Sequence, residues 1–172
     1  MTTVFTLGHS DRGFDEVVQM MRAHEVEQLV DVRRFPRSRT HPQWNQAAIV
    51  EALPTGIGYA WLAELGGRRY TKVGVKSPNG WWKVKAFRDY ADYMTSKEFA
   101  HGLRQLLDLA RSRSTAIMCS EAVPWRCHRR LITDALLANG LHVQHIISKT
   151  RTEPAVLTPA ALVHDGHLEY PS

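Results

Sequence analysis

Both cysteines of the chain lie in one short segment, CSEAVPWRCHRR, which runs from Cys119 to Arg130. Cys127 and His128 stand at the predicted start of a helix, beside Arg126 and Arg129. The helix dipole and the neighbouring cations favour the thiolate of Cys127, which could then act as a nucleophile or as a redox group. The same segment could instead bind an anion through backbone N–H groups and arginine side chains. It is the most specific candidate site in the sequence.

Cys119 allows several interpretations. It ends an apolar strand, where a cysteine is often a small buried residue without chemistry. The spacing from Cys119 to Arg126 resembles the Cys-x5-Arg loop of phosphatases and rhodaneses, although it is one residue longer and lacks the glycines of that loop. A disulfide between Cys119 and Cys127 is also conceivable and would suggest redox control. Glu121, two residues further on, is a candidate general base or an acceptor for the arginines.

Metal binding is an alternative that the sequence disfavours. Cys119, Cys127, His128 and His9 could supply four ligands of the types that zinc prefers. However, the spacing Cys-x7-Cys-His is not that of a zinc ribbon, and the surrounding arginines would repel a cation. No GxGxxG, GxxxxGK[ST] or GxSxG motif is present either. We therefore predict no metal and no cofactor.

Polar residues also follow other predicted strands. His9 and Ser10 come after the first one, where a turn could hold an anion. Asp31 lies within the apolar stretch LVDVR, so its carboxylate needs a partner, for which Arg33 and Arg39 are candidates. Asp31 could orient Arg33 or His9, or take a proton. An ion pair with a purely structural role explains it equally well.

The positive charge is concentrated in two stretches of the chain. The net charge is +5, and 16 arginines stand against 6 lysines. Residues 33–49 and 65–88 contain no acidic residue. Because an arginine side chain pairs with phosphate or carboxylate through two donors, these stretches indicate an anionic partner. In the second stretch Trp81 and Trp82 could stack nucleic-acid bases or could cover the core.

Short apolar runs alternate with stripes of helical periodicity. The runs predict strands at 4–7, 28–32, 58–62, 115–119 and 143–147, and the stripes predict helices near 14–21, 44–53, 87–94, 99–110 and 131–136. This order predicts a single α/β domain over residues 1–150, in three layers, with a mainly parallel sheet of about five strands and helices on both faces. Residues 68–83 are expected to form a long loop. Residues 151–172 are expected to be a loose C-terminal extension with one short helix.

Length and composition exclude several classes of protein. The 172 residues suit one domain, and a hydrophobic content of 44% is enough for a core. Two cysteines cannot form a disulfide framework. No apolar run approaches the roughly 20 residues that span a bilayer, and the N-terminus lacks the features of a signal peptide. We expect a cytoplasmic protein without a membrane partner.

Several motifs together resemble those of one family. They are TLGHS at 6–10, VDVRRFPRSR at 30–39, LGG at 65–67, SPN at 77–79, YADYM at 90–94 and CSEAVPWRCHRRLI at 119–132. In order and spacing they resemble the family known as domain of unknown function 488. The resemblance implies a cytosolic α/β domain in which the GHS, VDVR, SPN and Cys-Glu…Cys-His-Arg positions share one site. It implies no particular reaction, substrate or cofactor.

In an open parallel sheet, ligands bind beyond the carboxyl ends of the strands. We therefore predict a basic, cysteine-containing pocket there, in an enzyme acting on a phosphate-bearing substrate such as a nucleotide or a nucleic acid. A non-catalytic nucleic-acid-binding module and a metal or thiol redox domain remain alternatives, and the oligomeric state is left open. The catalytic candidates are Cys119, Cys127, Glu121, Asp31 and His128. The anion-binding candidates are His9, Ser10, Arg33, Arg37, Ser38, Arg39, Ser77, Asn79, Arg126 and Arg129.

Overall fold

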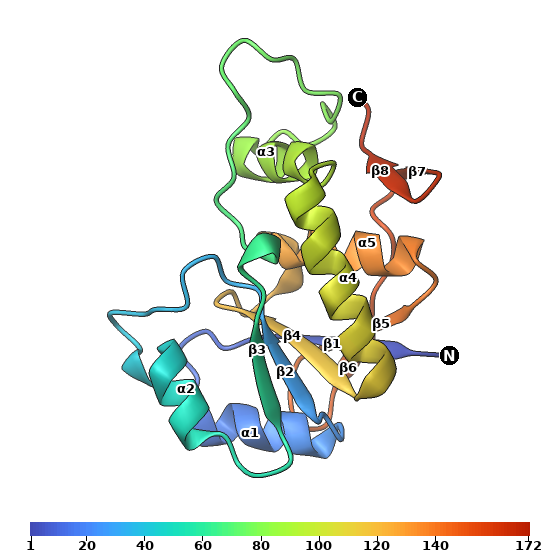
Figure 1. Cartoon of the computed structure of the whole chain (residues 1–172). Helices are drawn as coiled ribbons and strands as arrows, with labels where there is room; N and C mark the ends of the chain where they lie inside the picture. The colour runs from blue at the N-terminus through green and yellow to red at the C-terminus, as the bar shows by residue number, and fades with distance from the viewer.

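The computed structural model describes all residues from 1 to 172 and is built around one six-stranded sheet (Figure 1). The strand order is β3-β2-β4-β1-β5-β6. Five strands are parallel: β1 (Thr3–Gly8), β2 (Gln28–Asp31), β3 (Gly58–Trp61), β4 (Thr115–Cys119) and β5 (His142–Ile146). The sixth, β6 (Thr152–Pro154), is antiparallel to β5. The predicted α/β class with a mainly parallel sheet is confirmed.

Helices cover both faces of the sheet. The helices α1 (Phe14–Ala23) and α2 (Gln46–Ala52) lie on one face, and α3 (Lys85–Tyr93), α4 (Lys97–Ser112) and α5 (Arg129–Ala138) lie on the other (Figure 1). Three single turns of 3₁₀ helix, Pro42–Trp44, Ala63–Leu65 and Pro124–Arg126, connect them. None of the helices combines the length and the apolar character that crossing a bilayer requires.

Alternation along β4 decides on which face its cysteine lies. Ala116 and Met118 point to the core under α1 and α2, whereas Ile117 and Cys119 point to the core under α3, α4 and α5. This is the two-residue period of an extended strand buried on both faces. Cys119 is therefore in the same core cluster as Cys127, which precedes α5.

A glycine lets the chain beyond β4 cross directly over the end of β1. A Cβ atom on Gly8 would lie 1.6 Å from the carbonyl oxygen of Glu121, so no other residue fits there. The backbone N–H of His9 donates to the carbonyl of Cys119 at 3.0 Å, and that of Ser10 donates to the carbonyl of Ser120 at 2.9 Å. The exits of β1 and β4 are thereby held together.

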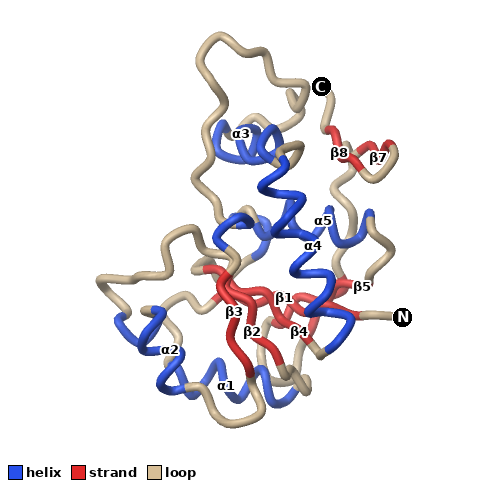
Figure 2. The backbone as a smooth tube through the Cα atoms, viewed as in Figure 1, coloured by secondary structure: helices blue, strands red, loops and turns tan.

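The long loop predicted between 68 and 83 is present, since no helix or strand occurs between residues 66 and 84 (Figure 2). Its tryptophans are not both available for stacking. Trp82 is only 4% exposed and belongs to the core, and its ring contacts Trp81 edge-on at 4.9 Å. The alternative in which these residues cover core is the one that the structure favours.

The prediction that residues 151–172 form a loose extension with one short helix is wrong. The segment contains no helix; it adds β6 to the main sheet and then forms a hairpin of β7 (Leu162–His164) and β8 (His167–Glu169). Tyr170 is fully buried, and its hydroxyl donates to Asp134 Oδ2 on α5 at 2.8 Å. Leu168 and Tyr170 attach the extension to the core, and two buried positions are too few to show as a periodic pattern in the sequence.

Candidate functional site

A cavity of about 370 Å³ opens at the carboxyl ends of β2 and β4. Both cysteines, His128 and Glu121 line it, and so does a group of arginines. Those arginines are Arg33, Arg34, Arg37, Arg68 and Arg126. The structure thus brings together sulfur, imidazole and positive charge from β2, β4, α5 and the 66–84 loop.

The two cysteine sulfurs are close neighbours. Their Sγ atoms lie 2.8 Å apart, and both thiols are free. Both residues are buried, with Cys119 1% and Cys127 6% exposed, and both line the cavity. Burial raises the pKa of Cys119 well above its ordinary value. The hydrogen bond between the two sulfurs holds the pKa of Cys127 below its ordinary value, although burial opposes this. The two thiols therefore differ in acidity, and Cys127 loses its proton more easily than Cys119.

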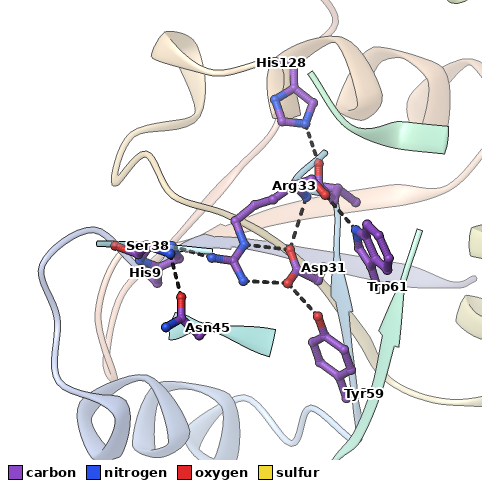
Figure 3. A network of polar contacts seen from close by, with 9 residues as sticks. His9, Asp31, Arg33, Ser38, Asn45, Tyr59, Trp61 and His128 are labelled. Carbon is purple, nitrogen blue, oxygen red and sulfur yellow. Dashed lines mark hydrogen bonds and ion pairs between the residues drawn. The ribbon is translucent and has the colours of Figure 1, made fainter. Parts of the chain in front are cut away.

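His128 is oriented towards Cys127 by a backbone carbonyl. Its Nε2 donates to the carbonyl oxygen of Val32 at 2.8 Å (Figure 3). This leaves Nδ1 facing Cys127 Sγ at 3.3 Å. The imidazole ring packs against Tyr90, with the ring centroids 5.2 Å apart. Burial lowers the pKa of His128, so the ring is neutral at pH 7 and Nδ1 can accept a proton.

Arg129 is a buried cation without a carboxylate partner. It is 1% exposed, and its Nη2 donates to the carbonyl oxygens of Glu121 at 3.0 Å and Ala122 at 3.3 Å. No ion pair includes it, and its Nε has no acceptor. Its backbone N–H points at Cys127 Sγ, 3.5 Å away. Because a buried charge needs a counter-charge, Arg129 favours the thiolate of Cys127.

Asp31 and Arg33 form a buried ion pair at the exit of β2 (Figure 3). Arg33 donates through Nε at 2.9 Å and through Nη2 at 2.7 Å, and its backbone N–H adds a third bond at 3.1 Å. The hydroxyl of Tyr59 donates to the same carboxylate at 2.7 Å, and burial raises the pKa of that hydroxyl. Trp61 Nε1 donates a hydrogen bond to the backbone carbonyl of Arg33 at 2.8 Å. Arg33 lines the cavity, but its guanidinium is occupied by Asp31.

His9 is placed by Arg33 rather than by the cysteines. Its Nδ1 donates to the carbonyl of Ser10 at 2.8 Å, so Nε2 accepts from Arg33 Nη1 at 3.4 Å. The ring stacks on Trp44 at 4.8 Å, and burial lowers the pKa of His9 to about 4. Neither His9 nor Ser10 lines the cavity. Asp31 thus orients Arg33 directly and His9 through it, which is one of the roles the sequence suggested for Asp31.

The other predicted anion-binding residues on the loop after β2 and on the turn before α5 differ in whether they line the cavity. Arg37 and Arg126 line the cavity and are exposed, and their side chains have no partner within the chain. Arg39 is exposed outside it. The Ser38 hydroxyl accepts from the backbone of His41 at 3.0 Å and stabilises its own loop.

Ser77 and Asn79 do not join the cavity, contrary to the prediction of one shared site. The carboxylate of Asp92 accepts from Ser77 Oγ at 2.5 Å and from Asn79 Nδ2 at 2.7 Å. Asn79 Oδ1 accepts from the backbone of Tyr170 at 2.9 Å. These polar groups saturate one another, so the SPN motif ties the 66–84 loop to α3 and to the C-terminal segment.

Eight of the residues that line the cavity were absent from the predicted site, among them Arg34, Arg68 and Phe35. Arg34 donates to the carbonyl of Arg68 and lies over the Phe35 ring, 5.4 Å from its centroid. Phe35 is 53% exposed. The two acid-free stretches were the available signal, because each supplies one of these arginines.

The structure contains no group of three or more His, Cys, Asp or Glu side chains placed to hold a metal ion. The four-ligand set of Cys119, Cys127, His128 and His9 is not formed, since His9 contacts Arg33 instead. Glu121 contributes its backbone carbonyl, which the Cys119 sulfur approaches at 3.7 Å. Its carboxylate lines the cavity without an ion pair.

Fold and cavity together define an α/β protein with a cysteine–histidine pair and unpaired arginines at the strand ends. The family model for the domain of unknown function DUF488 matches residues 13–136, so the chain belongs to this family. The match contains every residue that lines the cavity, whereas His9, Ser10 and the C-terminal segment lie outside it. No curated protein and no solved structure matches the chain.

Proposed function

We propose that this protein is a cysteine-dependent enzyme whose cavity binds a phosphate-bearing substrate. One observation carries the proposal: the Cys127 sulfur, 3.3 Å from His128 Nδ1, lines the same cavity as several arginines. A thiolate beside a neutral histidine is the arrangement of an activated nucleophile. Arginines without a carboxylate partner supply the forked donors that a phosphate group accepts.

Each residue has a separate role in this proposal. The phosphate group binds to Arg37 and Arg126, which form no ion pair or hydrogen bond with another side chain, and Arg68 lines the same cavity. Cys127 Sγ attacks the substrate, and His128 Nδ1 takes the thiol proton and returns it to the leaving group. A volume of about 370 Å³ suits a small phosphate ester or a mononucleotide.

The proposal is tested by alkylation with iodoacetamide, followed by peptide mapping. Cys127 is expected to react faster than Cys119 and faster than free cysteine at pH 7, and inorganic phosphate is expected to slow the reaction. Arg126→Gln and Arg37→Gln should weaken this protection by phosphate. Arg104→Gln is the matched control, because Arg104 is exposed on α4 and lines no part of the cavity. Two equally slow thiols, or alkylation indifferent to phosphate, would contradict the proposal.

Binding of single-stranded nucleic acid is a second candidate function. It is supported by Phe35 and Trp125, each 53% exposed, which stand beside Arg34 and Arg126 and could stack bases next to the arginines. Binding of an oligothymidylate that falls steeply with salt and is weakened by Phe35→Ala, but is unchanged in Cys127→Ser, would favour a binding module over an enzyme. Tyr70→Ala serves as the control, since Tyr70 is 78% exposed and does not line the cavity.

A further inference from the structure

The Cys119–Cys127 pair has a geometry that nucleophilic chemistry alone does not require. A single thiolate beside His128 is enough for attack, yet a second free sulfur lies 2.8 Å from the first. Seven residues separate the two cysteines, and the turn between them brings the end of β4 back to the start of α5. Both side chains point into the same core cluster under α5. A disulfide between them therefore needs only a small approach of the two sulfurs.

The surroundings of the two sulfurs differ in a way that gives each a distinct role. Cys127 has His128 Nδ1 at 3.3 Å and the backbone N–H of Arg129 at 3.5 Å. Cys119 has only the carbonyl oxygen of Glu121, at 3.7 Å, besides its partner sulfur. A carbonyl oxygen accepts a hydrogen bond from a thiol but cannot stabilise a thiolate, so Cys119 keeps its proton while Cys127 loses its proton more readily. A reactive thiolate beside a second, protonated thiol is the pattern of an oxidation-sensitive pair.

We propose that Cys127 is a site of oxidation by hydroperoxides and that Cys119 resolves it into an intramolecular disulfide. His128 Nδ1 takes the Cys127 thiol proton, and the thiolate attacks the OH-bearing oxygen of the hydroperoxide. The O–O bond breaks, and the departing oxygen takes the proton from His128 and leaves as alcohol or water. Cys127 is then a sulfenic acid. The Cys119 sulfur attacks it, the S–O bond breaks, and hydroxide leaves as water with the Cys119 proton. In balance, two thiols and one hydroperoxide give one disulfide, one alcohol or water, and one water.

The cavity and His128 affect which oxidants can react with the two cysteines. Both cysteines are buried and both line the cavity, so an oxidant that reaches them through it must be small. His128 can relay the proton to the leaving oxygen, because its Nδ1 faces Cys127 while Nε2 is held by Val32. The consequence for activity, though not the oxidation itself, rests on the function proposed above: the disulfide would remove the nucleophile while Arg37 and Arg126 still bind phosphate.

The experiment treats reduced protein with hydrogen peroxide and follows the intact mass. The chain has only two cysteines, so an intramolecular disulfide has one possible pairing. The expected result is the loss of two hydrogens, reversed by dithiothreitol, with a Cys119–Cys127 cross-linked peptide after digestion. In Cys119→Ser the expected product is one added oxygen on Cys127, which dimedone traps as sulfenic acid. Cys127→Ser should react with peroxide at least ten times more slowly at cysteine.

The outcomes separate this proposal from the proposed function. If the wild-type protein forms the reversible disulfide, and Cys119→Ser keeps phosphate-protected alkylation of Cys127 but stops at its sulfenic acid with peroxide, both proposals stand. If wild-type protein only gains oxygen, or cross-links only between molecules, the disulfide proposal is overturned while the alkylation result still decides the other. Peptide mapping distinguishes oxygen on cysteine from oxygen on the five methionines, which dithiothreitol does not remove. Circular dichroism shows whether each variant is folded.

Discussion

His128 donates from Nε2 to the carbonyl oxygen of Val32 over 2.8 Å, and this bond fixes which nitrogen faces the sulfur. With the proton on Nε2, Nδ1 presents a lone pair to Cys127 Sγ at 3.3 Å. The backbone at the exit of β2 thus selects the tautomer at the start of α5. The same exit holds the Asp31–Arg33 ion pair, so the site depends on how rigidly β2 ends.

The first prediction concerns the protonation of Cys127. In His128→Gln the side-chain amide can still donate to Val32, but it offers no basic nitrogen to the thiol. We expect the pH profile of iodoacetamide alkylation to move upwards and the rate at pH 7 to fall about tenfold, which corresponds to one pKa unit. His101→Gln, on the exposed surface of α4, is the control. An unchanged profile would show that His128 does not act on the sulfur.

The second prediction tests the packing behind the histidine. A Cβ on Gly67 would lie 3.1 Å from His128 Nδ1, closer than almost any ordinary contact, so Gly67→Ala must displace the ring. We expect alkylation of Cys127 to slow several-fold while the protein remains folded. Gly13→Ala is the matched control, because a Cβ there meets nothing within 4 Å. Equal behaviour of the two variants would mean that the ring position is unimportant.

A third prediction distinguishes the buried ion pair from surface pairs. In Asp31→Asn the Arg33 guanidinium, 6% exposed, loses its counter-charge. Breaking such a buried pair should lower the free energy of unfolding by about 3–5 kcal/mol in urea titrations. In Asp108→Asn the lost partner is Arg111, and both side chains are mostly exposed, so the change should stay below about 1 kcal/mol. Similar losses in both variants would remove the structural role assigned to Asp31.

The fourth prediction is a dependence of stability on pH. Burial lowers the pKa of His9 and His145 from 6.5 to about 4, so between these values the unfolded chain binds more protons than the folded protein. The free energy of unfolding should therefore fall as the pH drops from about 6.5 to about 4, by about 2–3 kcal/mol for each histidine. Urea titrations across this range measure it. His9→Gln should flatten the slope.

The sequence predicts the parts of the candidate site that follow from regular strands and helices. It does not predict contacts between residues that are far apart in the chain. Cys119 ends an apolar strand and Cys127 precedes a helix, so their meeting at the strand ends followed from the α/β pattern. Which arginines are occupied did not follow from it. Arg33 is held by Asp31 and Arg129 by backbone carbonyls, while Arg37 and Arg126 have no partner. The sequence does not show which arginines are free to bind a ligand, because the groups that accept their hydrogen bonds can come from other parts of the chain.

The C-terminal segment shows the same limit and supplies the last prediction. Leu168 and Tyr170 are both buried and alternate with exposed residues, but two apolar positions are too short a pattern to predict a buried strand from the sequence. The Tyr170 hydroxyl donates to Asp134 Oδ2, and Tyr170→Phe would leave that oxygen unpaired beneath the core surface. An unsatisfied buried acceptor should cost about 1–3 kcal/mol in the free energy of unfolding. Tyr70→Phe should cost almost nothing, since Tyr70 is 78% exposed and its hydroxyl has no partner within the chain.

Because no residue of 151–172 lines the cavity, the alkylation rate of Cys127 should be equal in Tyr170→Phe and in the unmodified protein at temperatures where both are folded. A slower rate in Tyr170→Phe would instead mean that the segment supports the site through α5.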